Sequence, residues 1–270
     1  MTGRRMKEIQ VNADEFRDKC IVIKYCIADI FSECDRAGYR LIRYPIGSDG
    51  VLGFAQIRYG DKIVFSNSSQ RLSREIFSVA HEIGHIWLHL NEEQNMFIDN
   101  EFIDSDEYET EANYFAACLL MPEDKVIKYI SLEMSDKPID RWTALDIAKI
   151  MTSFNVSFDM AINRLVNLGK INGATRFRLE TEKNERKVCN LLKMIGGNSK
   201  LNIATNEKMI PSEYMDWVVD NYNSGIISEE TLKKSLGYFE LSIEDISDDI
   251  HPRLEENSES LDDLIGGMND

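Results

Sequence analysis

Basic residues and cysteines are few in this chain, and both shortages narrow what it can do. Lys and Arg number 31 against 47 Asp and Glu among 270 residues, which gives a formal net charge of -16. A chain this acidic is repelled by phosphate backbones, so we expect no direct binding to nucleic acid. The five cysteines are an odd number and form no C-x-x-C pair. We therefore expect buried or incidental thiols rather than a disulfide framework or a cysteine metal site.

Long apolar runs are also missing. No stretch approaches the roughly 18 apolar residues of a membrane span. The N-terminal sequence MTGRRMKEIQVNADEF has no apolar core of the kind found in a secretory signal. We therefore expect a cytoplasmic protein without membrane association. With 43% hydrophobic residues, the chain can still bury a sizeable core.

The periodicity of apolar residues predicts an α+β arrangement. Short strands are expected between the first and second of a series of helices, and Gly60-Asp61 suits a hairpin turn between two of them. The strand over residues 62–66 could lie at a sheet edge and pair with an extended peptide, or it could be an ordinary strand without a ligand. The expected helices cover residues 13–36, 72–90, 106–121 and, in two pieces broken near Asn155, 142–168; the expected strands cover 39–46, 51–59 and 62–66.

The character of the chain changes after residue 173. Separate helices are expected near residues 182–195, 212–222 and 229–236, with glycine-containing breaks between them. From residue 240 onward acidic residues dominate, which is typical of a solvated tail. The predicted organisation is therefore a first domain over 1–173, an all-α region over 174–250 and an acidic, disordered tail over 251–270.

Residues 81–85 read His-Glu-Ile-Gly-His, which matches the H-E-x-x-H pattern of helical zinc sites. Residues four apart lie on one face of a helix, so His81 and His85 could hold one metal ion. Glu82 would then face a water bound to that ion as a general base. Gly84 costs a helix about 1 kcal/mol relative to Ala, which predicts close packing against its backbone. The alternative is a core helix with two incidental histidines.

The third ligand of such a site must come from elsewhere, because a catalytic zinc usually takes three protein ligands. His89 lies about 80° away from the ligand face of an ideal helix, so we expect it to be structural or to support a ligand. The second helix offers Glu107, Glu109 and Glu111. Glu111 lies at the margin of the apolar stripe and is the first choice, since a buried carboxylate needs a partner. Glu107 and Glu109 are expected to face solvent.

Two separated motifs resemble those of the ImmA/IrrE metallopeptidase family: FSVAHEIGH at residues 77–85 and EANYFAACLLMP at 111–122. The resemblance covers roughly residues 15–170, with Ser78 and Val79 in place of the usual Thr and Leu. It implies a minimal zincin-like fold, in which helices pack on a small sheet. It also implies the ligands His81, His85 and Glu111, with Glu82 as general base. Tyr114 and His89 are further candidates, as donors to the oxyanion or as supports for a ligand.

The same resemblance implies a zinc-dependent, site-specific endopeptidase, with Mn²⁺ as the alternative metal. Family members cut a regulatory protein, often a DNA-binding repressor. The alternative is an antirepressor or antitoxin-like binding protein with a structural metal site, which the C-terminal helices and the acidic tail favour. Residues 145–168 have a helix-turn-helix-like outline, but few bases, so packing on the core is the expected role.

Overall fold

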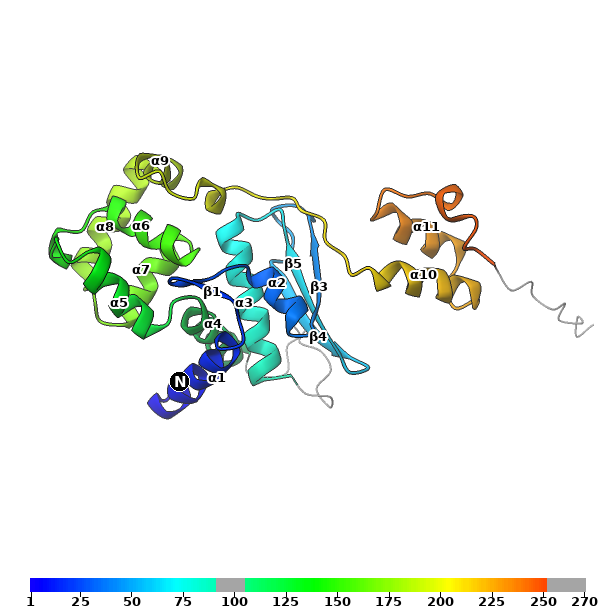
Figure 1. Ribbon diagram of the computed structural model, residues 1–270, viewed down its shortest axis with the longest axis horizontal. Helices are drawn as coiled ribbons and strands as arrows, with labels where there is room; N and C mark the ends of the chain where they lie inside the picture. The colour runs from blue at the N-terminus through cyan, green and yellow to red at the C-terminus, as the bar shows by residue number, and fades with distance from the viewer. Residues whose placement is uncertain (91–104, 252–270) are drawn as a thin grey trace, which may run out of the picture. The chain divides into compact units, whose positions relative to one another are not determined.

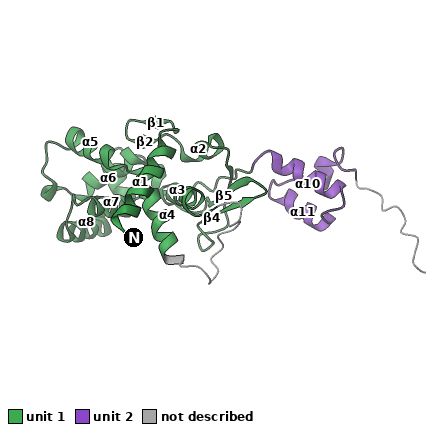
Figure 2. Ribbon diagram, turned by 90° about the horizontal axis from the view of Figure 1, so that it is seen from below, with its two compact units in different colours: residues 1–210 green, residues 211–270 purple. Residues whose placement is uncertain are grey.

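The computed structural model describes residues 1–90 and 105–251. The chain divides into two compact units, Met1–Ile210 and Pro211–Asp270 (Figure 2). The described part mixes helices with small sheets and has a helical C-terminal region, so the predicted α+β class is confirmed. Residues 91–104, between two of the expected helices, and nearly all of the expected acidic tail lie outside the described residues.

Unit 1 combines helices with two small sheets (Figure 1). Its helices are α1 (Gly3–Arg17), α2 (Ile30–Arg36), α3 (Leu72–Leu88), α4 (Ser105–Leu120), α5 (Glu123–Glu133), α6 (Ala144–Phe154), α7 (Phe158–Asn167), α8 (Gly173–Arg186) and α9 (Val188–Met194). Its strands are β1 (Val22–Ile23), β2 (Cys26–Ile27), β3 (Arg40–Tyr44), β4 (Gly53–Arg58) and β5 (Asp61–Asn67).

The single helix predicted over residues 13–36 is wrong, because the structure has two helices there with a small hairpin between them. The Thr2 side chain caps α1, and the Asp29 side chain accepts a hydrogen bond of 3.0 Å from the backbone N–H of Phe31 at the start of α2. Between the helices, β1 pairs with β2. Phe16 and Phe31 are both buried, which fits their apolar spacing, but apolar spacing alone does not show the cap that begins a new helix.

The three-stranded sheet has the order β3-β5-β4, with β3 parallel and β4 antiparallel to β5. The strand that could have been an edge, β5, is therefore central, and β3 and β4 are the outer strands. Arg58 pairs with Asp61, so the hairpin loop is Tyr59-Gly60 rather than Gly60-Asp61. Both loop residues have positive φ, 52° and 86°, as a tight two-residue turn requires.

Helix α3 lies alongside β4 and β5 and packs against α4 (Figure 1). A Cβ built on Gly84 would lie 3.1 Å from Cδ1 of Phe115 and 3.3 Å from Cα of Ala112, both on α4. The prediction that Gly84 admits close packing is confirmed. This contact sets the spacing between the two helices that carry the site.

Helices α6 to α9 extend the same hydrophobic core. Asn155 ends α6 in the left-handed conformation, with φ of 55°, at the predicted break. Leu179 on α8 and Leu191 on α9 are fully buried in the cluster that also contains Trp142 and the α3 side chains. The boundary predicted at residue 173 therefore falls inside unit 1, because the helices after it belong to the first core.

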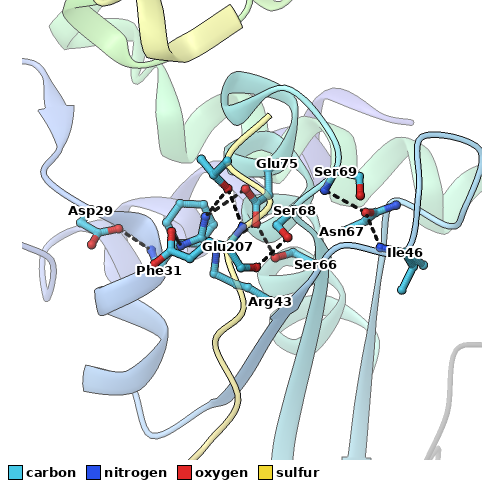
Figure 3. A network of polar contacts seen from close by, with 11 residues as sticks. Asp29, Phe31, Arg43, Ile46, Ser66, Asn67, Ser68, Ser69, Glu75 and Glu207 are labelled. Atoms are coloured by element: carbon cyan, nitrogen blue, oxygen red, sulfur yellow. Dashed lines mark hydrogen bonds and ion pairs between the residues drawn. The ribbon is translucent and has the colours of Figure 1, made fainter. Parts of the chain in front are cut away.

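The segment that ends unit 1 is tied to β3 (Figure 3). Arg43 and Met209 exchange backbone hydrogen bonds of 2.8 and 2.9 Å. The guanidinium of Arg43 donates to both carboxylate oxygens of Glu75 on α3, at 2.9 and 3.0 Å, and to Glu207 at 2.7 Å. This network, buried at Arg43 and Glu75, joins the sheet, α3 and the segment around residue 207.

Unit 2 is small and helical. It contains α10 (Glu213–Asn223) and α11 (Glu229–Gly237), which share a core of Val218, Leu232, Leu236 and Ile246. The predicted helices near 212–222 and 229–236 are confirmed. Across the described parts of both units, the helices are too short or too polar to cross a membrane.

Candidate metal centre

A cleft of about 620 Å³ runs between the edge strand β4 and the helices α3 and α4. The stretch from Val51 to Gln56 forms one wall. Side chains of α3 and α4 form the other: Phe77, Ser78, His81, Glu82, His85, Glu109 and Asn113. The cleft is therefore lined by all three reactive side chains of the H-E-x-x-H pattern, His81, Glu82 and His85.

His81 and His85 point their Nε2 atoms at one another, 2.9 Å apart, because they lie one helical turn apart on α3. The carboxylate of Glu109 reaches both atoms, with Oε2 3.1 Å from His81 and Oε1 3.1 Å from His85. These are two imidazole nitrogens and a carboxylate oxygen within 4.8 Å of one another. Such a donor set suits Zn²⁺ and leaves room for a further ligand.

Glu111, the first choice from the sequence, is elsewhere. Its carboxylate accepts hydrogen bonds from Arg5 and lies 3.1 Å from Nε2 of His89. Glu109, which we expected to face solvent, is half-exposed and is the glutamate that the structure brings to the histidine pair. Residues 109 and 111 are about 200° apart around a helix, so only one of them can reach the His81–His85 pair.

Each histidine of the pair is held through its other ring nitrogen. Nδ1 of His81 lies 3.1 Å from Oδ1 of Asn113, and Nδ1 of His85 lies 3.0 Å from Nδ1 of His89. Partners of this kind fix the orientation of ligand histidines in metal sites. His89 ends α3 with φ of -127°, outside helical values, and its ring lies beside that of His85, one turn earlier. We expected a structural or supporting role for His89, and its position is compatible with one.

The charges of the site stabilise one another. Burial lowers the pKa of His81, but the hydrogen bond with Glu109 and the charge of Glu82 outweigh burial, and the pKa is raised. The two histidines hold the pKa of Glu109 well below its ordinary range. Burial lowers the pKa of His89 to about 4, so this ring is neutral at pH 7. Glu109 is therefore an anion beside two imidazoles, as a metal ligand set requires.

Glu82 is buried and lies against β4. A Cβ built on Gly53 would come within 3.2 Å of its Oε1. Glycine at this position leaves space for the carboxylate between helix and strand. The side chain lines the cleft together with the histidine pair, where it could accept a proton from a reacting water.

Tyr114 is not among the residues that line this cleft. It lines a neighbouring cavity of about 660 Å³, and its ring lies 5.9 Å from the guanidinium of Arg164.

Two residues that contact the site, Asn113 and Arg5, were not predicted from the sequence. Asn113 lies four residues after Glu109, on the same helical face, and this spacing was the available signal. No spacing pattern pointed to Arg5, because it is more than 100 residues away from its partner Glu111.

Two histidines from one helix and a carboxylate from the next, beside an open edge strand, could hold a metal ion in the way that metallopeptidases do. The comparisons agree. A family model described as the IrrE N-terminal-like domain of the M78 peptidases matches residues 34–166, and this part of the chain belongs to that peptidase family. The ImmA/IrrE resemblance is confirmed.

The chain is also similar to an uncharacterized immunity region protein 2 of Bacillus phage phi105. The two are 31% identical over 85 residues, which is 32% of this chain and 54% of the relative. The chain thus spans about half the length of this curated relative.

Proposed function

We propose that this protein is a zinc-dependent endopeptidase that acts in the cytoplasm and cuts a specific regulatory protein. The observation that carries the proposal is the convergence of His81, His85 and Glu109 in one cleft that also holds Glu82. We assign the first three as metal ligands and Glu82 as general base. Glu109 replaces Glu111 in this assignment because of its distances to the histidine pair.

The donor set fits Zn²⁺ better than Mn²⁺. Two imidazoles suit zinc, whereas manganese prefers carboxylate, carbonyl and water oxygens. When bound, Zn²⁺ supplies Lewis acidity, which lowers the pKa of water towards 7 and polarises a carbonyl. The hydrogen bonds to Nδ1 of His81 and His85 leave Nε2 of each ring directed at the cleft.

The role of Glu82 follows from its place in the cleft. Its carboxylate is buried beside Gly53 and can accept a proton from the attacking water. The same carboxyl can then pass the proton to the departing amine. General base catalysis of this kind contributes typically 10²–10⁴-fold to a rate.

Strand β4 offers a way to hold an extended substrate. Of the described strands, β5 is its only neighbour, so the outer edge of β4 has backbone groups that can pair with a peptide. Phe54 is 41% exposed, and Val51 and Leu52 line the same cleft. A peptide added as a further strand would gain main-chain hydrogen bonds, while these side chains would favour apolar residues.

The substrate class rests on the resemblance to the ImmA/IrrE family, whose members often cut a DNA-binding repressor, and such a repressor is accordingly the proposed substrate. The similarity to an immunity region protein of a phage fits a regulatory role. In this proposal the protein acts on the repressor itself, so it needs no contact with DNA. Its net charge of -16 disfavours such contact.

The test is incubation of the purified, zinc-loaded protein with the repressors encoded beside its gene. Wild type should cut one of them at a single position, and Glu82→Gln should cut at least 10²-fold more slowly while still binding zinc. Glu107→Gln, an exposed change on α4, is the matched control and should cut at the wild-type rate. If wild type and Glu82→Gln release the repressor from DNA equally well without cleavage, the protein acts by binding and the peptidase proposal fails.

A further inference from the structure

The ligand His85 is connected to the N-terminal helix α1 through a chain of buried polar groups. Nδ1 of His85 meets Nδ1 of His89 at 3.0 Å, and Nε2 of His89 meets Oε2 of Glu111 at 3.1 Å. Arg5 completes the chain with a two-pronged contact, from Nε to Oε1 at 2.7 Å and from Nη2 to Oε2 at 2.5 Å. Three of the four side chains are buried, and Arg5 is one-third exposed.

The direction of the hydrogen bonds follows from the chemistry of each group. An ionised carboxylate has only acceptors, so Nε2 of His89 donates to Glu111. A neutral imidazole then has its lone pair on Nδ1 and accepts from Nδ1–H of His85. Nε2 of His85 is left with its lone pair, and this atom faces His81 and Glu109. The order of groups therefore selects the tautomer of His85 that can bind a metal.

Arg5 keeps the hydrogen bonds between Glu111, His89 and His85 in this order. Its guanidinium donates hydrogen bonds to both oxygens of the buried Glu111 carboxylate. Without the guanidinium, a buried carboxylate would be left without its cation. The planar guanidinium also holds both carboxylate oxygens of Glu111 in place, with Oε2 in contact with Nε2 of His89.

We propose that Arg5, Glu111 and His89 form a positioning relay that sets the tautomer and orientation of His85, and that α1 is therefore part of the metal centre. The proposal rests on the proposed metal site. It extends that site to a helix outside the residues 34–166 that match the family model. Arg5 is a positioning residue, because it acts only through Glu111 and His89.

The experiment measures metal affinity by competition with a chelator, together with the visible absorption of bound Co²⁺, which reports coordination geometry. Arg5→Met should lower zinc affinity about 10–100-fold, the usual cost of losing an outer partner of a ligand. It should also change the Co²⁺ spectrum. Arg5→Lys should recover part of the affinity, because an ammonium supplies the charge but no planar fork. Arg4→Met is the matched control, since Arg4 is exposed and pairs with Glu8 on the surface, and it should bind as wild type does.

Glu111→Gln is a second variant that tests the relay and preserves the size of the side chain. Circular dichroism checks that each variant keeps α1. Equal zinc affinities and Co²⁺ spectra for Arg5→Met, Glu111→Gln and Arg4→Met would overturn the relay, while the peptidase proposal would stand if wild type still binds zinc and cuts. A wild-type protein that binds no zinc would overturn both.

Discussion

Oε2 of Glu109 lies 3.1 Å from Nε2 of His81, although the two residues are on different helices and Glu109 is half-exposed. The contact spans the α3–α4 packing that Gly84 makes possible. Only when the two helices approach this closely can a glutamate of one join a histidine pair of the other. The geometry of the proposed metal centre thus depends on a helix–helix distance as much as on the ligands.

The first prediction concerns this carboxylate. Glu109→Gln should lower zinc affinity by more than the roughly 10–100-fold expected for the loss of an outer partner, because it removes an anionic ligand. Chelator competition on the purified protein measures the effect. Glu107→Gln, an exposed change two residues earlier, should have no effect. Should Glu109→Gln bind zinc as wild type does, the third ligand is a different residue.

How far the sequence predicted the site depends on the range over which each contact acts. The histidine pair and Glu82 follow from spacing within one turn of helix, and the sequence contains that information. The choice between Glu109 and Glu111 does not follow from spacing, because both lie on a helix with acidic residues at 107, 109 and 111. Burial of Glu111 was expected and is observed, at 5% exposure. In the structure its partner is the guanidinium of Arg5 on α1.

The fold shows the same limit. The α3 and α4 helices, the three strands and the break at Asn155 were predicted from local patterns. The order β3-β5-β4 was not, since strand order depends on pairing between segments that local patterns do not relate to one another. Of the two alternatives for the strand over 62–66, the edge position is therefore excluded, because β5 lies between β3 and β4.

A second prediction concerns Gly53, which lies between the carbonyl oxygen of Phe65 and the carboxylate of Glu82. A Cβ at this position would be 2.8 Å from that oxygen and 3.2 Å from Oε1 of Glu82, so β4 or the base must move. Gly53→Ala should lower kcat by up to about 10²-fold, since a displacement near 1 Å can cost this much. Zinc affinity should stay at the wild-type value. Gly173→Ala, with open space around its Cβ, is the control; equal kcat for both variants would exclude contact with the base as a constraint.

A third prediction tests the network that ends unit 1. Arg43→Met leaves Glu75, which is almost fully buried, without its bidentate partner. Removing one member of a buried ion pair typically costs 3–5 kcal/mol, so we expect a loss of about 3–5 kcal/mol in the free energy of unfolding. Glu207→Gln removes only the half-exposed arm of the network and should cost about 1 kcal/mol or less. Urea denaturation of the two variants measures both values, and similar losses would show that the Arg43–Glu75 pair is not the dominant contact.

The last prediction is a pH dependence at Asp146, far along the chain from the metal centre. Asp146 caps α6 and accepts hydrogen bonds from Nζ of Lys137 at 2.5 Å and from the backbone N–H of Thr143 at 2.8 Å. Burial raises its pKa, but these bonds together outweigh burial, and the pKa lies below the ordinary value of 3.8. A carboxyl whose folded pKa is depressed stabilises the fold above its unfolded pKa, and loses this effect as the pH falls through the folded pKa.

Asp146→Asn should therefore destabilise the protein by about 1.5–3 kcal/mol at pH 7, the range for hydrogen bonds to charged groups. The difference from wild type should be unchanged at pH 5 and should shrink below about pH 4, where the carboxyl of the unfolded chain becomes protonated. Urea denaturation at pH 7, 5 and 3 in the presence of a chelator measures it without a contribution from bound metal. Lys137→Met should show part of the same dependence, because it removes one of the bonds that depress the pKa. A difference between Asp146→Asn and wild type that stays constant down to pH 3 would mean that the charge of Asp146 does not stabilise α6, and that only the shape of the cap matters.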